Sequence, residues 1–288
     1  MTTTTTSLTD EQVRQFDREG YLILPPVFSA AELGAFRSEA DRILELVVNA
    51  SIAQRENHPR TSMAVWPDHS ITMRKVQPIN DLSDVLASVS CDERLIGPMR
   101  RIMGDDPLLM EEKLNYKQHV AVTGADLSCL FGSVPDDHFP LHHDWGYYVQ
   151  QGYPENTISS AVAFDDCAGR GPIRVLPGSH KLDPELLNPD PEGGDGRVVT
   201  APFADAHRVP VEAEAGCVML FHAKLIHDSE PNHSGLPRRM MIYSHYPASH
   251  GGDPDRRNGG MRVTARAFED SYRTMVAAGT YADVFRLS

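Results

Sequence analysis

The sequence lacks the marks of several broad protein classes. Basic residues are outnumbered, with 27 Lys and Arg against 40 Asp and Glu, which leaves a formal net charge of −13. This balance argues against a nucleic-acid partner, whose phosphate backbone selects basic patches. No stretch approaches the roughly 20 consecutive apolar residues that cross a bilayer, so we predict no membrane partner. The first seven residues, a threonine run without a basic or apolar region, predict a disordered tail and no signal peptide.

Cysteines are few, and their spacing predicts no site. Only four occur, they are widely scattered, and none belongs to a Cys-x-x-Cys pair. That pattern predicts reduced thiols in a cytoplasmic protein, with neither a disulfide framework nor a thiolate zinc site. At 288 residues the chain is long enough to bury a substantial core as one large domain. Nothing in the composition indicates an oligomeric state.

Helix signals dominate the first third of the chain. Thr9 and Ser29 stand where N-caps are expected, each before an apolar pattern at helical spacing. A short buried strand, Tyr21–Leu24, is predicted between these two helices. A third helix is predicted near 92–103, and it should end before Gly104.

From about Leu108 the sequence pattern changes to one that favours β-strands. Before it, residues 49–72 show no clear period. After it come short β-prone runs separated by turn-rich segments, at 108–120, 157–164, 172–176, 216–222 and 239–246. The stretch 183–197 contains several Pro, Gly and Asp residues and is predicted to be a surface loop.

Helices followed by many short strands predict a mainly β protein with flanking α-helices, built on a sandwich or barrel. We expect a single domain over 8–288, after the tail of residues 1–7. Within that domain we expect a helical N-terminal part at 8–107 and a β core at about 108–250. A C-terminal helical extension should follow the core.

The triplet His142-His143-Asp144 is the most informative pattern in the chain. Side chains alternate along an extended strand, so His142 and Asp144 should share a face while His143 points away. With a second histidine from a distant strand, they would form the two-histidine, one-carboxylate triad of non-haem iron(II) oxygenases. This triad leaves positions on the iron open for a cosubstrate and dioxygen. Alone, a His-x-Asp triplet arises by chance and is more often an ordinary polar pair.

The segment after the strand predicted at 216–222 supplies the missing parts. His227 is the expected distal ligand, whereas His222, inside the strand, is better explained as a packed core histidine. Arg238 lies eleven residues beyond His227 at the start of the next strand, and its guanidinium suits a bidentate grip on a carboxylate. Ser229 can share the face of His227. A diacid such as 2-oxoglutarate would then chelate iron at one end and meet Arg238 and Ser229 at the other; a surface arginine is the alternative interpretation of Arg238.

Several motifs, taken in order, resemble the phytanoyl-CoA dioxygenase family, which includes the bacterial ectoine hydroxylases. The likeness extends from about Leu8 to Tyr246. It comprises an opening helix and strand, a Lys-Leu-Asn-Tyr-Lys segment, the His-His-Asp triplet, a Pro-Gly-Ser-His-Lys segment and a final motif, found at Phe16–Leu24, Lys113–Lys117, His142–Asp144, Gly171–Lys181 and His227–Arg238. Ordered motifs at family spacing are far more specific than any single one.

The resemblance implies a double-stranded β-helix, a jelly-roll barrel of cupin type, with flanking N-terminal helices. It assigns iron binding to His142, Asp144 and His227, and 2-oxoglutarate binding to Ser229 and Arg238. These are the residues that the spacing alone already selects.

The resemblance also implies further cosubstrate contacts. Lys117 matches a position associated with 2-oxoglutarate or with the active-site wall, and Asn115 lies beside it in the sequence. Arg74 resembles an upstream arginine of the family. The alternative interpretation of Lys117 is a solvated lysine on a strand.

The activity that the resemblance implies is that of an iron(II)- and 2-oxoglutarate-dependent dioxygenase. Such an enzyme consumes dioxygen, releases succinate and carbon dioxide, and by default hydroxylates an unactivated C–H bond; desaturation, epoxidation and ring formation are alternatives. Related halogenases replace the ligand carboxylate with a small residue, so the presence of Asp144 argues against halogenation. A zinc hydrolase and a non-catalytic jelly-roll binding protein are rival interpretations. Metal content and 2-oxoglutarate turnover distinguish them.

The substrate is less well defined than the reaction. Trp145 and Tyr147 follow the triplet and are candidate pocket residues, with ordinary core as the alternative. Arg174 is a candidate contact for a polar substrate, or else a surface strand residue. The residues after Asp144 depart from the ectoine-hydroxylase pattern, and no basic cluster suited to the phosphates of coenzyme A is apparent. By analogy alone, we expect a small or medium organic molecule, such as an intermediate of secondary metabolism.

Overall fold

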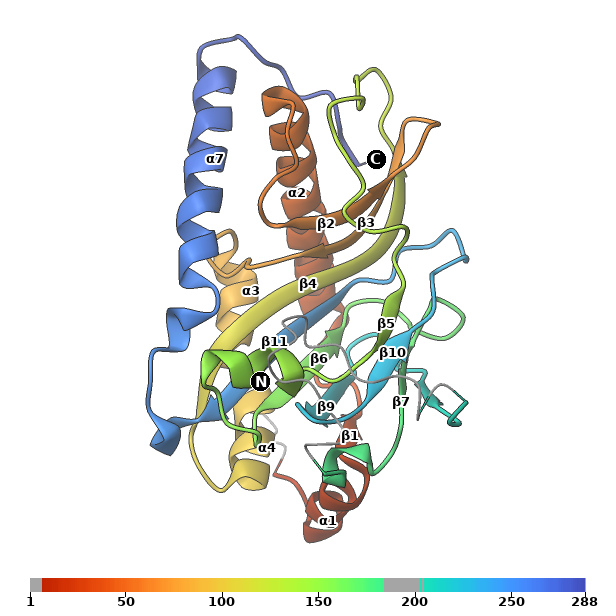
Figure 1. The fold of residues 1–288 in the computed structure, drawn as a ribbon, viewed down its shortest axis with the longest axis vertical. Coiled ribbons are helices and arrows are strands. Elements are labelled where there is room, and N and C mark those ends of the chain that lie inside the picture. Colours follow the sequence, from red (N-terminus) through yellow and green to blue (C-terminus); the bar gives the residue numbers. More distant parts are fainter. Residues whose placement is uncertain (1–6, 184–202, 204, 288) are drawn as a thin grey trace.

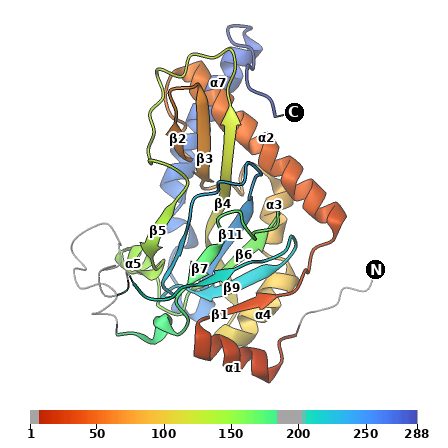
Figure 2. The same ribbon diagram turned by 90° about the vertical axis from the view of Figure 1, so that its right-hand side faces the viewer.

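The computed structural model describes residues 7–183, 203 and 205–287. The predicted N-terminal tail and the predicted surface loop at 183–197 lie almost entirely outside these described residues. The described chain forms two antiparallel sheets, and its helices pack mainly against the larger one (Figure 1). A quarter turn shows α2 (Ala30–Gln54) along one side of the molecule and β5 (Phe139–His142) of the smaller sheet at the other (Figure 2). Within the described ranges, no helix is both long enough and apolar enough to cross a bilayer.

The N-terminal helices begin and end at the predicted capping residues. The hydroxyl of Thr9 accepts a hydrogen bond from the backbone N–H of Gln12, whose side chain returns to Thr9, and Gly20 at φ 81° ends the helix. Ser29 and Glu32 form the same capping box at the start of the second helix. The described α-helices are α1 (Asp10–Glu19), α2 (Ala30–Gln54), α3 (Asp84–Val89), α4 (Glu93–Met103), α5 (Trp145–Tyr148) and α7 (Gly259–Ala277).

The larger sheet has seven strands in the order β1-β9-β6-β11-β4-β3-β2. Each neighbouring pair is antiparallel. Four of the five predicted β-prone runs form strands of this sheet, and the fifth forms a strand of the smaller sheet. The seven strands are β1 (Tyr21–Leu24), β2 (Thr61–Val65), β3 (Ser70–Val76), β4 (Pro107–Ala121), β6 (Ile158–Ala163), β9 (Val218–His222) and β11 (Met240–Pro247).

The smaller sheet has the order β5-β10-β7-β8, and its strands are β5 (Phe139–His142), β7 (Ile173–Val175), β8 (Val209–Val211) and β10 (His227–Ser229). An apolar layer that includes Phe221 and Ile242 of the larger sheet and Ile173 of the smaller one joins the two. The expected jelly roll is therefore present. Within the described residues the two sheets share no strand pairing, so the jelly roll is open.

Residues 49–72, which show no clear period in the sequence, are largely regular in the structure. The helix α2 continues to Gln54, and the remainder supplies β2 and the start of β3. The strand alternation is obscured because the pairing registers of β2 with β3 and of β3 with β4 both shift beside Arg74. Such irregularities add a residue to one strand and disturb the period of two.

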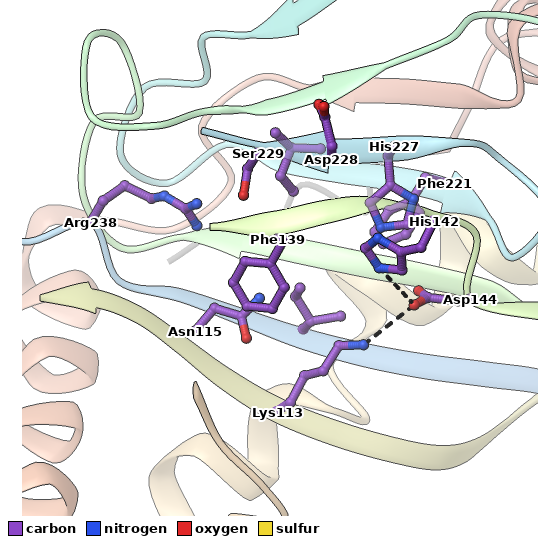
Figure 3. A pocket seen from close by; sticks show the side chains of 12 residues that line it. Lys113, Asn115, Phe139, His142, Asp144, Phe221, His227, Asp228, Ser229 and Arg238 are labelled. Carbon is purple, nitrogen blue, oxygen red and sulfur yellow. Dashed lines mark ion pairs between the residues drawn. The ribbon is translucent and has the colours of Figure 1, made fainter. Parts of the chain in front are cut away.

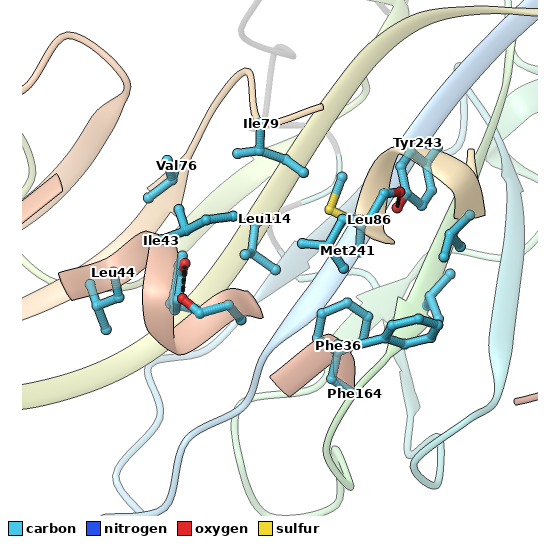
Figure 4. Packing of buried hydrophobic residues seen from close by; sticks show 14 of the residues in the cluster. Phe36, Ile43, Leu44, Val76, Ile79, Leu86, Leu114, Phe164, Met241 and Tyr243 are labelled. Atoms are coloured by element: carbon cyan, nitrogen blue, oxygen red, sulfur yellow. Dashed lines mark hydrogen bonds between the residues drawn. The ribbon is translucent and has the colours of Figure 1, made fainter. Parts of the chain in front are cut away.

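The main core lies between the larger sheet and its helices (Figure 4). Phe36 and Ile43 of α2 and Leu86 of α3 meet Leu114 of β4 and Met241 of β11, and none of these side chains is more than 5% exposed. Burial of each such side chain contributes roughly 1.5–3 kcal/mol. Because side chains alternate along a strand, this packing turns the intervening residues of β4 and β11 toward the smaller sheet, where the candidate site lies.

Candidate metal centre

Two strands of the smaller sheet bring two histidines together. β5 and β10 pair antiparallel with His142 directly opposite His227, and their ring centroids are 4.2 Å apart. Asp144 adds a carboxylate, and one ligand atom from each of the three residues lies within 4.8 Å of the others. Figure 3 shows the three side chains converging at one end of a cavity. Two imidazole nitrogens and one carboxylate oxygen at this spacing suit one transition-metal ion.

Asp144 reaches this point through a turn. β5 ends at His142, and Asp144 has the helical angles φ −68° and ψ −31° directly before α5. The bend brings Oδ1 of Asp144 within 3.8 Å of Nε2 of His142. The expectation that His142 and Asp144 share a face through strand alternation is therefore wrong, because the strand ends at His142. The two side chains converge for a different geometric reason.

The two imidazoles are held in the tautomer that a metal requires. Nδ1 of His142 lies 2.7 Å from the carbonyl oxygen of Pro140, and Nδ1 of His227 lies 2.9 Å from that of Leu225. A carbonyl oxygen only accepts hydrogen bonds, so each Nδ1 donates and each Nε2 keeps a lone pair for the site. Burial, followed by the neighbouring His227, lowers the pKa of His142 to about 3, which keeps its ring neutral.

The carboxylate of Asp144 has one paired and one unpaired oxygen. Oδ1 lies 3.6 Å from Nζ of Lys113, whereas Oδ2 is buried without a hydrogen-bond partner among the described residues. Burial alone would raise the pKa of Asp144. Lys113 and the two histidines outweigh this effect and lower the pKa to about 2. An ionised, unpaired buried oxygen is costly. A bound cation would satisfy it, so the residues present fit a metal ion.

The opposite end of the cavity contains a buried arginine. Arg238 is 1% exposed, and its Nη2 donates to the carbonyl oxygen of Gly171 at 2.9 Å. Its Nε is buried and has no hydrogen-bond partner among the described residues. Ser229 and Asn115 line the cavity with it, and Oδ1 of Asn115 is also unsatisfied there. This end therefore presents an unpaired guanidinium donor beside a hydroxyl and an amide, which suits a carboxylate.

Lys117 and Arg74 lie near the cavity but do not line it. Nζ of Lys117 donates to the carbonyl oxygens of Ser229, at 3.4 Å, and of Glu230. Arg74 donates to Oγ of Ser62 and to the carbonyl oxygen of His138, both at 3.2 Å. Both cations also lie over the ring of Phe139, which does line the cavity. In this geometry they hold the wall of the cavity.

The three candidate substrate residues, Trp145, Tyr147 and Arg174, lie in different surroundings. Tyr147 lies closest, with its ring centroid 6.3 Å from that of His142. Trp145 stacks on His143, with a centroid distance of 6.2 Å, and does not line the cavity. Arg174 forms ion pairs with Asp228, at 2.5 Å, and with Glu230. Its guanidinium is therefore occupied by two carboxylates.

Sequence reasoning missed Lys113 and Phe139, which both line the cavity. The signal for Lys113 was present, because it lies two residues before Asn115 on β4 and alternation places both on one face. Phe139 starts β5, three residues before His142. His222 lies outside the cavity lining, and its Nδ1 accepts a hydrogen bond from the backbone N–H of Lys224 at 3.1 Å.

Comparison with known proteins gives the same family. Residues 16–240 match phytanoyl-CoA dioxygenase (PhyH). The ectoine dioxygenase of Halomonas elongata is 26% identical over 252 residues, which cover 82% of this chain and 69% of that protein. The structure of EctD from S. alaskensis with bound Fe has a TM-score of 0.59 at 25% identity, covering 86% of this chain and 80% of that one.

A second solved structure, the carbocyclase SnoK from nogalamycin biosynthesis, has a TM-score of 0.61 at 21% identity. The aligned region covers 86% of this chain and 87% of the SnoK chain. At that identity the likeness concerns the fold alone. The family match, in contrast, extends from α1 to the first residue of β11 and includes every residue of the triad. The protein therefore belongs to the phytanoyl-CoA dioxygenase family of iron(II)- and 2-oxoglutarate-dependent dioxygenases.

Proposed function

We propose that this chain hydroxylates an unactivated C–H bond of a small or medium organic molecule, with His142, Asp144 and His227 as the ligands of iron(II). The observation that carries the proposal is the pairing of two ends in one cavity. Three metal-ligand atoms lie within 4.8 Å of one another at one end, and the buried Arg238 lies at the other. A metal hydrolase would need the first end but has no use for the second.

The ligands are prepared for a divalent cation before it binds. The carbonyl oxygens of Pro140 and Leu225 fix the Nδ1–H tautomer of the two histidines, so little reorganisation is needed. Lys113 lies beside Oδ1 of Asp144, and its positive charge helps to keep the carboxylate ionised for the metal. Iron bound there would supply the activation of dioxygen that is coupled to conversion of 2-oxoglutarate to succinate and carbon dioxide.

Arg238 and Ser229 are proposed to bind the distal carboxylate of 2-oxoglutarate. Ser229 follows His227 by two residues on β10 and faces the same side. The unpaired Nε of Arg238 supplies a charge-assisted donor in a place closed to water. Asn115 adds an amide beside them, and Lys117 and Arg74 support the wall that Phe139 forms. A diacid held in this way would be oriented with its keto-acid end toward the metal.

The outcome of the reaction is proposed by default from the chemistry of the site. Asp144 fills the position that a halide ligand would need, so halogenation is disfavoured. Solved structures of the same fold include a carbocyclase and an epimerase of nogalamycin biosynthesis; the fold therefore does not distinguish hydroxylation from ring formation. We propose an intermediate of secondary metabolism as the substrate. Product mass separates the outcomes, since hydroxylation adds one oxygen atom and desaturation or ring closure removes two hydrogens.

The test is an anaerobic titration of metal-free protein with iron(II) and then 2-oxoglutarate, followed through the visible charge-transfer band of the chelate. We expect the band with the wild-type protein. Arg238→Ala should raise the 2-oxoglutarate concentration needed for half-formation about 10–100-fold, since a charge-assisted hydrogen bond contributes roughly 1.5–3 kcal/mol. Arg101→Ala is the matched control, because Arg101 is half-exposed and its partner among the described residues is the exposed Asp10. Folded wild-type protein that gives no band would contradict the iron assignment.

A further inference from the structure

We propose that the substrate carries an anionic group, most simply a carboxylate, and that Lys75 binds it beside the iron end of the cavity. This inference rests on the proposed function, and it adds to that function a chemical class of substrate. It depends on where the sheet places Lys75, on the missing partner of its ammonium group and on the charges around it.

The pairing of β3 with β4 turns Lys75 toward the candidate site. Lys75 lies directly opposite Asn115 in the antiparallel register, and opposed residues of an antiparallel pair share a face of the sheet. Asn115 lines the cavity, as does Lys113, two residues earlier on β4. Val76 and Leu114, the next pair in the register, face the opposite side and belong to the main core. Lys75 and Lys113 therefore project from the same face of neighbouring strands.

Lys75 is partly buried and has no counter-ion. Among the described residues, no hydrogen bond or ion pair involves its ammonium group. The charges that act on it most strongly are cationic and belong to Lys113, Arg74 and Arg257, with Asp144 the weaker opposing charge. Burial and these cations lower the pKa of Lys75 to about 7. A cation in such a place destabilises the fold unless an anion joins it.

The neighbouring cations do have partners, and they leave an excess of positive charge. Lys113 lies 2.8 Å from Oε1 of Glu111, and Arg257 pairs with the other oxygen of the same carboxylate. One carboxylate is thus shared by two cations. Asp144, the second acid nearby, would give its charge to the metal. With Asp144 bound to the metal, Glu111 is the remaining carboxylate that the described residues pair with Lys113 and Arg257, so a further anion is complementary to these two cations and Lys75.

The position of Lys75 separates it from the proposed 2-oxoglutarate anchor. The charges that act most strongly on Lys75 are those of Lys113, Arg74 and Arg257, and Lys113 is the neighbour of Asp144 at the iron end. Lys117, in contrast, is acted on first among charges by Arg238, at the other end. An anion shared by Lys75 and Lys113 would therefore lie beside Asp144, at the metal end of the cavity.

The experiment measures anion preference by calorimetry, with the anaerobic complex of the protein with iron(II) and 2-oxoglutarate at slightly acidic pH. The probes are small carboxylic acids, each paired with its own primary amide, which has a similar shape but no charge. We expect at least one acid to bind about tenfold or more tightly than its amide in the wild-type protein. Lys75→Met should abolish that preference and Lys75→Arg should retain it. Lys181→Met is the control, because Lys181 is half-exposed and pairs with Asp17 on the surface.

Each outcome decides the proposal. It is overturned if no acid of the panel binds more tightly than its amide, or if Lys75→Met keeps the preference. It is also overturned if Lys75→Met instead weakens binding of 2-oxoglutarate, which would place Lys75 in the cosubstrate site. The charge-transfer band of the iron complex distinguishes this failure from failure of the proposed function. The band should form unchanged in Lys75→Met, and its absence in the wild-type protein would count against the iron assignment alone.

Discussion

The carboxylate of Asp144 shows how one residue can be both held and available. Its Oδ1 is near the ammonium of Lys113, while Oδ2 is buried and unpaired. Lys113 is in turn held by Glu111, so it does not depend on Asp144 for a partner. Lys113 therefore keeps the carboxylate ionised and in place, so that it is available to a metal ion.

This arrangement predicts that Asp144→Ala removes metal affinity without removing the fold. Loss of a direct ligand should weaken iron(II) binding by more than the roughly 10–100-fold that loss of an outer partner causes. Lys113 keeps its pair with Glu111, so the thermal midpoint should change little. Iron content after equilibrium dialysis measures the effect. Asp10→Ala, at an exposed acid on α1, is the control, and an iron content equal in the two variants would contradict the assignment of Asp144.

Lys75 predicts an unusual dependence of stability on pH. Its pKa is lowered from 10.5 to about 7 in the folded state, so between these values the unfolded chain binds more protons and stability rises with pH. The cost of the buried charge is therefore fully present below about pH 7. There, Lys75→Met should raise the free energy of unfolding by about 1–2 kcal/mol, allowing for screening by solvent. The gain should shrink toward pH 10.5. Denaturant unfolding at several pH values measures it, and a destabilised variant at low pH would refute the prediction.

At the scale of the elements, short turns determine where functional groups point. The turn before β7 contains Gly171, whose carbonyl oxygen accepts the hydrogen bond from Arg238. Gly171 has φ 65°, and a Cβ there would collide with the carbonyl oxygen of Glu230. Two requirements coincide at Gly171: a left-handed backbone conformation, and a close approach to the backbone of another segment of the same chain.

Gly171→Ala is therefore predicted to disturb both stability and cosubstrate binding. The matched variant is Gly169→Ala, because Gly169 has a similar φ of 68° but nothing within 4 Å of a Cβ. Each variant should lose about 1 kcal/mol from the backbone conformation. Only Gly171→Ala should lose a further 1–3 kcal/mol from steric overlap and need more 2-oxoglutarate to form the chelate. Chemical denaturation and the anaerobic titration measure the two effects, and equal behaviour of the two variants would contradict the argument.

At the scale of the whole molecule, a buried ionic cluster attaches the C-terminal helix α7 to the sheet. Arg60, with a side chain that is fully buried, lies 2.7 Å from Glu269 of α7 and 2.8 Å from Asp81. Its Nη1 also donates to the carbonyl oxygen of Pro78 at 2.6 Å. Nearer the start of the same helix, Arg262 pairs with Glu112 of β4 at 2.6 Å. These contacts join segments that are far apart in the sequence.

Breaking this cluster should destabilise the protein without altering the metal site. Arg60→Met leaves the carboxylates of Glu269 and Asp81 buried with fewer partners, and loss of one member of a buried pair typically costs about 3–5 kcal/mol. Arg273→Met is the control, because Arg273 and Asp270 form an exposed pair that contributes at most about 1 kcal/mol. Thermal unfolding measures the difference. The folded variant should bind as much iron(II) per chain as the wild-type protein in the same assay, and a loss of iron would show that the cluster acts on the site.

The parts of the fold predicted correctly from the sequence are those with local causes. The capping residues Thr9 and Ser29 and the glycine stop at Gly20 define two helices by contacts within a few residues. The β-prone runs are strands for a similar reason, since side-chain alternation is a property of each run. Residues 49–72 gave no such signal, because the register shifts beside Arg74 depend on pairing with two other strands.

The candidate site divides in the same way. The spacing of His227, Ser229 and Arg238 along one segment, from β10 to just before β11, is visible in the sequence. Arg174 looked equally available, yet it is paired with Asp228 and Glu230 in the structure. No sequence pattern reveals such a pairing, because Arg174 meets Asp228 only through the register of β7 with β10.

The sequence by itself determined the family, the candidate donor set for a metal and most of the secondary structure, because these depend on residue types and short-range spacing. Only the tertiary structure decided that Asp144 reaches the candidate metal position through a turn. It also placed Lys75 opposite Asn115, with no counter-ion among the described residues. It also decided that the jelly roll is open. The physical reason is common to all three: each depends on which faces and charges of distant segments meet, and that is fixed by strand register and packing.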